Sequence, residues 1–159
     1  MLNLWMALIA ALIVGLDQWT KYLTVANLEL YEKFPVLEGV FHFTYIRNPG
    51  AAFSSFEGAQ WLFALIFLVL TVWLIWERCH QTLGFTTSEW LLIAGIYGGG
   101  IGNMIDRFRF GYVVDMIATD FIDFPVFNVA DCFITVCGIA LVAHLIFCNK
   151  DFWKDEKEK

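Results

Sequence analysis

Charged side chains are scarce in this chain of 159 residues: they make up 16% of it, whereas 59% of its residues are hydrophobic. A soluble domain usually carries about 25% charged residues. The mean hydropathy of +0.64 is high for the same reason. We therefore interpret residues 1–159 as a single integral-membrane domain.

An excess of positive charge is also missing. Lys and Arg total 10 against 16 acidic residues, so the net charge is −6 and the pI is about 4.9. This balance argues against a nucleic-acid partner and against a polybasic lipid-surface patch. Residues 151–159 mix both signs, and we expect them to form a solvated tail.

Motifs for redox, metal and serine chemistry are absent as well. The cysteines show no C-x-x-C spacing, the histidines form no H-x-x-x-H pair, and no Gly-x-Ser-x-Gly elbow occurs. Metal sites and nucleophilic serines usually need such patterns. We therefore expect no metal or other cofactor, and we interpret the cysteines as small buried hydrophobic residues. They are Cys79, Cys132, Cys137 and Cys148.

Long uncharged stretches, by contrast, are frequent, and tryptophans lie near their ends. A transmembrane helix needs about 17 to 25 mainly apolar residues, and tryptophan favours the membrane boundary. The first stretch lacks the basic start and the cleavage site of a secretory leader. We predict an all-α membrane protein with four transmembrane helices, at about residues 3–20, 59–77, 90–106 and 130–148.

The connection between the first two predicted helices is too long for a simple turn. Residues 40–46 are rich in β-branched and aromatic types, and the following Asn48-Pro49-Gly50 is typical of a type II turn. We expect a small extramembrane β element here. Residues 78–89, between the second and third helices, read as a plain connector.

Helical spacing groups several polar residues. Asp17 and Lys21 are four residues apart and can pair locally. Gly99, Asn103 and Arg107 also step by four, which places an amide and a guanidinium on one helix face. The glycine-rich run at 98–102 could instead serve only helix packing.

Asp115 and Asp131 are the most informative residues, because each lies beside an apolar segment. A carboxylate at membrane depth is costly and is usually retained for function, so an acid/base pair is the first hypothesis. Asn128, three residues before Asp131, could form a helix capping box with it. Capping would explain Asn128 fully and Asp131 partly, but it would not explain Asp115. We expect Asp120 and Asp123 to be solvent-facing loop residues.

Two other functions are compatible with parts of this pattern. A Ser/Lys peptidase would use Ser54 or Ser55 with Lys21. A small proton-coupled transporter would keep Asp17, Asp115 and Asp131 inside a helical bundle for proton relay. Against the transporter, no internal repeat is detectable.

Five motifs, taken together in order and spacing, resemble those of bacterial lipoprotein signal peptidase, also called signal peptidase II. They are Asp17-x-x-x-Lys21, 47–54 (RNPGAAFS), 98–107 (GGGIGNMIDR), 113–115 (VVD) and 127–131 (FNVAD). The resemblance runs through nearly the whole chain. It implies an aspartic endopeptidase that cleaves diacylglyceryl-modified prolipoproteins before the lipidated Cys, without a cofactor.

The resemblance also implies a catalytic pair and a set of supporting residues. Asp115 and Asp131 are the implied catalytic pair. The implied substrate-binding or supporting residues are Asn48, Gly50, Asn103, Arg107, Asn128, Asp17 and Lys21. The partners implied are prolipoprotein substrates and membrane lipids, with no obligate protein partner.

Location and orientation follow from the resemblance rather than from charge. It implies the bacterial inner membrane, cytoplasmic termini, and an active site and β element near the periplasmic face. Basic residues are evenly divided between the two sides of a four-helix topology, so the positive-inside count is tied. If Lys21, Arg47 and Arg107 belong to a site, the remaining basic residues favour cytoplasmic termini.

Overall fold

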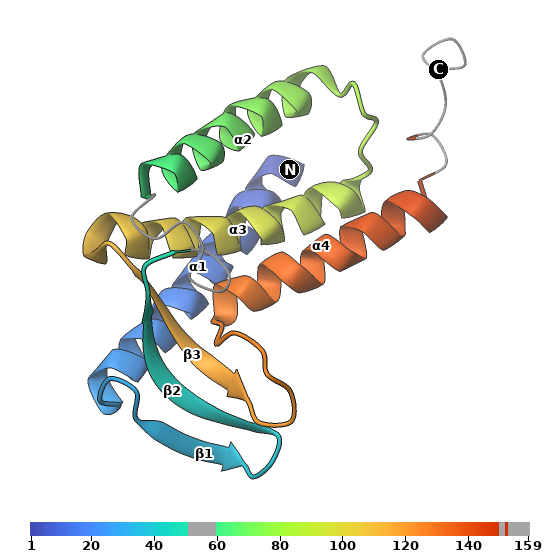
Figure 1. The fold of residues 1–159 in the computed structure, drawn as a ribbon. Coiled ribbons are helices and arrows are strands. Elements are labelled where there is room, and N and C mark those ends of the chain that lie inside the picture. Colours follow the sequence, from blue (N-terminus) through green and yellow to red (C-terminus); the bar gives the residue numbers. More distant parts are fainter. Residues whose placement is uncertain (51–59, 150–151, 153–159) are drawn as a thin grey trace.

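A bundle of helices with a small sheet at one end forms the described part of the chain, residues 1–50, 60–149 and 152 of a computed structural model (Figure 1). The helices are α1 (Leu2–Asn27), α2 (Gln60–His80), α3 (Thr87–Phe110) and α4 (Val129–Phe147). The strands are β1 (Lys33–Leu37), β2 (Phe41–Asn48) and β3 (Val113–Thr119). Residue 59, where the second predicted span begins, and the tail at 151–159 apart from Phe152 lie outside the described residues.

The helices alternate in direction along the bundle. α1 and α3 run toward the sheet, whereas α2 and α4 run away from it (Figure 1). At the sheet end, the Gln60 side chain donates to the carbonyl of Gly111, 2.7 Å away. At the opposite end, Arg78 Nε donates to Asn3 Oδ1 at 3.0 Å. This arrangement is the one expected of consecutive membrane crossings.

Among the described residues, α1, α2 and α4 are long and apolar enough to cross a membrane. α3 has a sufficient length of about 36 Å at 1.5 Å per residue, but its hydropathy is lowered by glycines and by Glu89, Asn103, Asp106 and Arg107. These polar side chains are tolerated because α3 packs against each of the other three helices. The apolar helices make this an integral membrane protein.

The glycine run of α3 provides close packing on several sides. A Cβ added at Gly98 would lie 3.0 Å from the Ala10 Cα, and one at Gly99 would lie 2.6 Å from the Ala130 carbonyl oxygen. α1 and α4 therefore approach α3 at distances that a larger residue would prevent. Helix packing by residues 98–102 is confirmed, but packing is not their only role, because the Gly102 carbonyl also accepts from Gln18 Nε2 at 3.2 Å.

The sheet has the order β1-β2-β3 with antiparallel neighbours. The strand expected at 40–46 is confirmed as β2, but β3 was not expected. Ile46 on β2 lies opposite Asp115 on β3, so Asp115 belongs to a strand beside the bundle. Its neighbours Val113 and Val114 are β-branched, which favours this conformation.

The segment between α2 and α3 is not the plain connector that we predicted. Glu77 and Glu89 flank it, and both are fully buried. Glu77 accepts hydrogen bonds from the Leu83 amide at 2.7 Å and from the Thr82 hydroxyl. Glu89 accepts from Asn149 Nδ2 at 2.8 Å. Buried carboxylates need such partners, so this connection is tied to the bundle.

The cysteines also differ from the prediction. Cys79 and Cys148 are exposed, while Cys132 and Cys137 are only partly buried. The interpretation as buried residues is wrong because the outward faces of these helices are themselves apolar, and a hydrophobic side chain there can contact lipid.

Candidate active site

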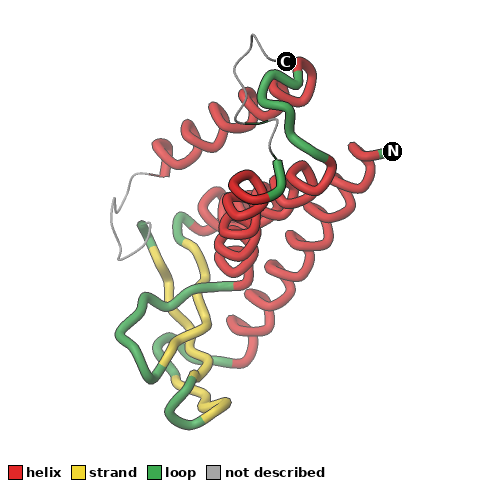
Figure 2. The backbone as a smooth tube through the Cα atoms, turned by 90° about the vertical axis from the view of Figure 1, so that its right-hand side faces the viewer, coloured by secondary structure: helices red, strands yellow, loops and turns green. Residues whose placement is uncertain are grey.

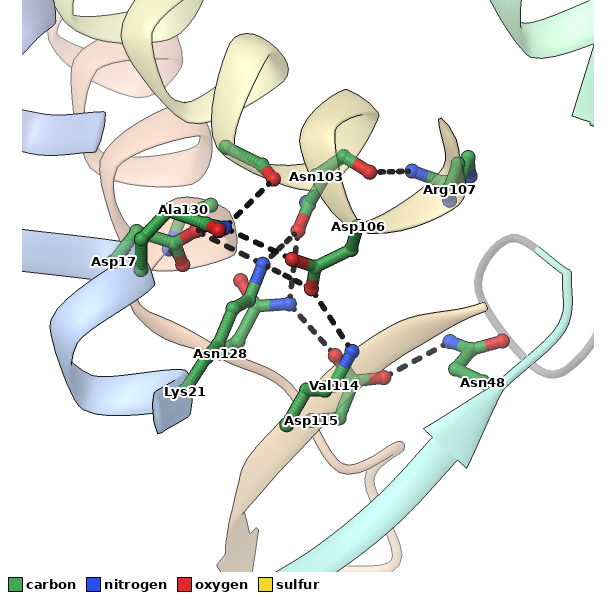
Figure 3. A network of polar contacts seen from close by, with 12 residues as sticks. Asp17, Lys21, Asn48, Asn103, Asp106, Arg107, Val114, Asp115, Asn128 and Ala130 are labelled. Atoms are coloured by element: carbon green, nitrogen blue, oxygen red, sulfur yellow. Dashed lines mark hydrogen bonds and ion pairs between the residues drawn. The ribbon is translucent and has the colours of Figure 1, made fainter. Parts of the chain in front are cut away.

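The predicted site residues meet at the sheet end, where β2 and β3 approach α1, α3 and α4. A cavity of about 680 Å³ opens there between α2, α3 and α4. Asp115 and Asp131 both line it, although one lies on a strand and the other on a helix. Figure 3 shows the polar network beside this cavity.

Asp115 is held by two side-chain amides. Its Oδ1 accepts from Asn128 Nδ2 at 2.7 Å, and its Oδ2 accepts from Asn48 Nδ2 at 3.0 Å. The residue is 2% exposed. Burial raises the pKa of Asp115 to about 6; the nearby charge of Asp131 also raises it, whereas the two amides lower it. Asp115 therefore keeps its proton to a higher pH than an ordinary carboxyl group.

Asp131 occupies the first turn of α4 and is partly exposed to the cavity. Its Oδ1 accepts from Asn103 Nδ2 at 2.8 Å, and its Oδ2 accepts from the backbone amide of Asn128 at 3.1 Å. The amino end of a helix stabilises negative charge. The environments of Asp115 and Asp131 therefore differ, as a general acid and a general base require.

Asn128 links the two carboxylates. The predicted capping box is present, since Asn128 Oδ1 accepts from the Asp131 amide at 3.0 Å. However, the side-chain nitrogen Nδ2 of Asn128 also donates to Asp115 Oδ1 and, at 3.0 Å, to Asn103 Oδ1. Capping therefore does not account for Asn128 fully, because its side-chain amide also holds Asp115 and Asn103.

Lys21 lies at the centre of a buried ionic cluster and is 3% exposed. Its Nζ lies 2.9 Å from Asp17 Oδ2, Asp106 Oδ2 and Asn103 Oδ1. Asp17 Oδ1 in turn accepts from the Ala130 amide at 3.0 Å. The predicted Asp17–Lys21 pair is confirmed, and it connects α1 to α3 and α4 (Figure 3).

Asp106 was missed as a functional candidate. Its Oδ2 accepts from the Val114 amide at 3.1 Å, and its Oδ1 accepts from Gln18 Nε2 at 2.9 Å. Through Val114 it anchors the strand that carries Asp115. Its spacing of three residues from Asn103 was the available signal, since such residues share a helix face.

Arg107 connects α3 to the chain beyond β2. Its Nη2 donates to the Gly50 carbonyl at 3.0 Å, and its Nη1 donates to the Asn103 carbonyl at 3.3 Å. The Asn48 side-chain oxygen accepts from the Gly50 amide at 3.0 Å. The structure therefore brings Asn48, Gly50 and Arg107 together at one edge of the site.

Several other predicted features lie away from this network. Asp120 and Asp123 are exposed, as expected, and Asp120 pairs with His42 at 2.8 Å. The type II turn at Asn48 depends on residue 51, and the alternative nucleophiles Ser54 and Ser55 belong to 51–59. Residues 51–59 lie outside the described residues.

Fold and site together define a class: a helical membrane protein in which two aspartates, both hydrogen-bonded to Asn128, face one cavity at the end of the bundle. Among the described residues, no group of three or more His, Cys, Asp or Glu side chains is arranged to hold a metal ion.

Comparison with known proteins identifies the family. The family model described as "Signal peptidase (SPase) II" matches residues 9–147, and the chain belongs to this family. It is 43% identical over 145 residues to the lipoprotein signal peptidase of Enterococcus faecalis, covering 90% of this chain and 88% of the relative. The lipoprotein signal peptidase of Streptococcus thermophilus is 42% identical over 147 residues, covering 91% of this chain and 89% of that protein.

Solved structures agree with the assignment. A structure described as a bacterial membrane enzyme at 2.3 Å resolution matches with a TM-score of 0.83 and 30% identity, covering 97% of this chain and 93% of the other. A second, at 1.9 Å resolution, matches with a TM-score of 0.80 and 30% identity, covering 91% and 94%.

Proposed function

We propose that the protein is an aspartic endopeptidase that removes the signal peptide from diacylglyceryl-modified prolipoproteins by cleaving before the lipidated Cys. Relatives named lipoprotein signal peptidase, similar over nine-tenths of the chain, support this function. The observation that carries the aspartic mechanism is that Asp115 and Asp131 share Asn128 and line one cavity.

The two carboxyl groups divide the proton transfers of peptide hydrolysis. Asp131 takes a proton from a water molecule whose oxygen attacks the scissile carbonyl carbon. Asp115 gives its proton to the departing nitrogen as the carbon–nitrogen bond breaks. The products are a new carboxyl group on the signal peptide and a free amine on the lipidated Cys. The raised pKa of Asp115 suits it to the acid role.

Substrate binding in this proposal uses both the apolar and the polar side chains that line the cavity. Phe63, Phe67 and Ile134 supply apolar surface from α2 and α4, which suits the signal peptide and the acyl chains. Asn48 and Arg107 line the same cavity, where they can hold the peptide backbone close to the aspartates, and the Arg107 guanidinium lies 4.6 Å from the centre of the Phe63 ring. The substrate would thus lie with its lipid toward the membrane and its scissile bond toward the sheet.

Cleavage by the purified protein is the direct test. In detergent, we expect the signal peptide to be released from a diacylglyceryl-modified precursor, while the matched precursor without lipid stays intact. A transporter requires a sealed compartment and would leave both peptides intact. The measurement is mass spectrometry of the products, which also locates the cut. Absence of cleavage by folded protein would contradict the proposed function.

The same assay tests whether a metal takes part. Because the proposed acid and base are carboxyl groups, turnover should be unchanged by a metal chelator. Loss of activity that is restored by added metal would contradict the mechanism while leaving the cleavage reaction itself in place.

Replacement of Asn48 should change both the rate and its pH dependence. The Asn48 amide lowers the pKa of Asp115 by stabilising the carboxylate. Asn48→Ala should therefore reduce turnover and raise the pKa of Asp115. If Asp115 acts as the acid, activity falls as pH rises through that pKa, near 6 in the unmodified protein. In the variant this alkaline limb should move to higher pH by about one unit.

The pH profile of kcat/KM provides the measurement, because it reports groups of the free enzyme. Asn27→Ala is a matched control, since Asn27 is exposed at the end of α1. An alkaline limb that moves to lower pH in Asn48→Ala would rule out Asp115 as the acid.

We place the protein in the bacterial inner membrane. In this proposal α3 also crosses the membrane, together with α1, α2 and α4, so that there are four crossings. The termini lie in the cytoplasm and the sheet lies near the periplasmic face. Lys21 and Arg107 are engaged in the polar network, so they do not act as topology signals. With these two residues set aside, the remaining basic residues favour a cytoplasmic position for the opposite end of the bundle.

Cysteine labelling tests this orientation in a variant that lacks the native cysteines. A cysteine replacing Glu38, exposed beside the sheet, should react with an impermeant reagent applied from the periplasm. One replacing Ser88, exposed at the opposite end, should react only after the membrane is opened. The reverse pattern would place the aspartates in the cytoplasm, where exported precursors do not present their lipidated Cys.

A further inference from the structure

A second groove lies on a different side of the bundle from the aspartates, between α1, α2 and α3. It has a volume of about 700 Å³. α2 stands apart from the other three helices and reaches the bundle chiefly through α3 (Figures 1 and 2). The groove walls are mostly alkyl side chains. They include Ala7, Ala11, Val14, Leu74, Ile75 and Ile93.

One end of this groove is polar and positively charged. Arg78 lines it and donates from Nε to Asn3 Oδ1 at 3.0 Å. The guanidinium lies 5.4 Å from the centre of the Trp90 ring. In the part of the chain that the structure describes, no ion pair involves Arg78. Its terminal nitrogens therefore have donors to offer an anion.

The groove has the length of one membrane leaflet. It runs along α1 from Asn3 to Val14, a rise of about 16 Å at 1.5 Å per residue. The hydrocarbon core of a bilayer is about 30 Å thick, so this is close to half of it. The charged end lies at the surface of the bundle opposite the sheet, where a lipid headgroup would be found.

We propose that this groove binds one anionic phospholipid, with its phosphate at Arg78 and Asn3 and an acyl chain between α1 and α2. The positive charge at the end of the groove distinguishes between two apolar ligands, a signal peptide and a phospholipid. A signal peptide carries positive charge ahead of its apolar segment, and Arg78 would repel it. A phospholipid in the leaflet beside this groove offers a negative phosphate to the Arg78 guanidinium.

Lipid retention measured by native mass spectrometry tests this site. The protein in detergent is offered equal amounts of phosphatidylglycerol and phosphatidylcholine with identical acyl chains. We expect one phosphatidylglycerol to be retained preferentially. Arg78→Gln should weaken its apparent affinity by about fivefold, whereas Arg78→Lys should retain most of it. Arg109→Gln, which removes an exposed charge at the sheet end, should have no effect.

A second pair of variants tests the apolar part without changing charge. Ala7→Phe places a ring in the groove and should displace the lipid. Ala143→Phe makes the same change at an exposed position of α4 and should leave binding intact. Thermal unfolding confirms that each variant is folded.

Three results would overturn the proposal. Equal retention of both lipids by every variant would show ordinary boundary lipid only. A dimer that Ala7→Phe dissociates would assign the groove to a second copy of the chain. Displacement of the lipid by a signal peptide would assign it to substrate. The experiment measures the mass of bound lipid and not cleavage. A negative result for lipid binding would therefore leave the proposed peptidase function unaffected.

Discussion

Replacement of Asp115 or Asp131 by asparagine should reduce cleavage of a lipidated precursor by at least about a thousandfold, within the range expected for loss of a general acid or base. Asparagine has nearly the same shape as aspartate, but its NH2 group cannot accept a hydrogen bond. One of the two bonds that each carboxylate accepts is therefore lost, while the other can persist. It can neither accept a proton from water nor donate one to the leaving nitrogen. The effect should appear in kcat, with substrate binding nearly unchanged.

Two nearby aspartates serve as matched controls for this experiment. Asp120→Asn and Asp123→Asn change exposed side chains outside the polar network and should leave turnover near that of the unmodified protein. Membrane insertion and thermal unfolding of all four variants should be similar. Near-normal turnover by either Asp115→Asn or Asp131→Asn would remove the proposed mechanism.

Among the proposed substitutions, replacement of Lys21 by methionine should cause the largest loss of folding stability. The change keeps the apolar stem but leaves Asp17 and Asp106 buried without their cation. Breaking a buried ion pair by removing one partner costs about 3–5 kcal/mol. Turnover should also fall, because the Asn103 oxygen loses one of its two donors. Thermal unfolding in detergent provides the measurement.

The double variant Lys21→Met with Asp106→Asn separates charge from packing. Neutralising one carboxylate should recover part of the lost stability, and a double-mutant cycle gives the coupling between the two residues. Lys33→Met is the control, because Lys33 is exposed on β1. If Lys21→Met and Lys33→Met were equally stable, the cluster would have no role in holding the helices together.

The helices could be predicted from the sequence because membrane crossing imposes a strong local requirement. An uncharged stretch of sufficient length is favourable in lipid as a helix wherever it occurs in the chain. Residues 130–148 match α4 (Val129–Phe147) for this reason. α1 continues to Asn27, beyond the predicted end at residue 20, because its later turns pack beside the sheet, where polar residues are tolerated.

Part of the site was also accessible from spacing alone. Asp17 and Lys21 pair as their separation of four residues allows, and Asn128 caps α4 with Asp131. These are short-range interactions within a single helix or its first turn. Asp115, in contrast, was singled out by its apolar context and by the motif resemblance, since no local spacing pattern gave it a partner.

What the sequence by itself determined is the membrane class, the approximate position of the helices and most of the polar residues that meet beside the cavity, with Asp106 as the exception. Only the tertiary structure decided that Asp115 lies on a strand, that Asn128 contacts both aspartates, and that Lys21 and Asp106 connect α1 to α3. The physical reason is the range of the interactions. A helix forms from contacts three or four residues apart, whereas Lys21 and Asn103 are 82 residues apart and meet only because the glycines of α3 let the helices approach closely.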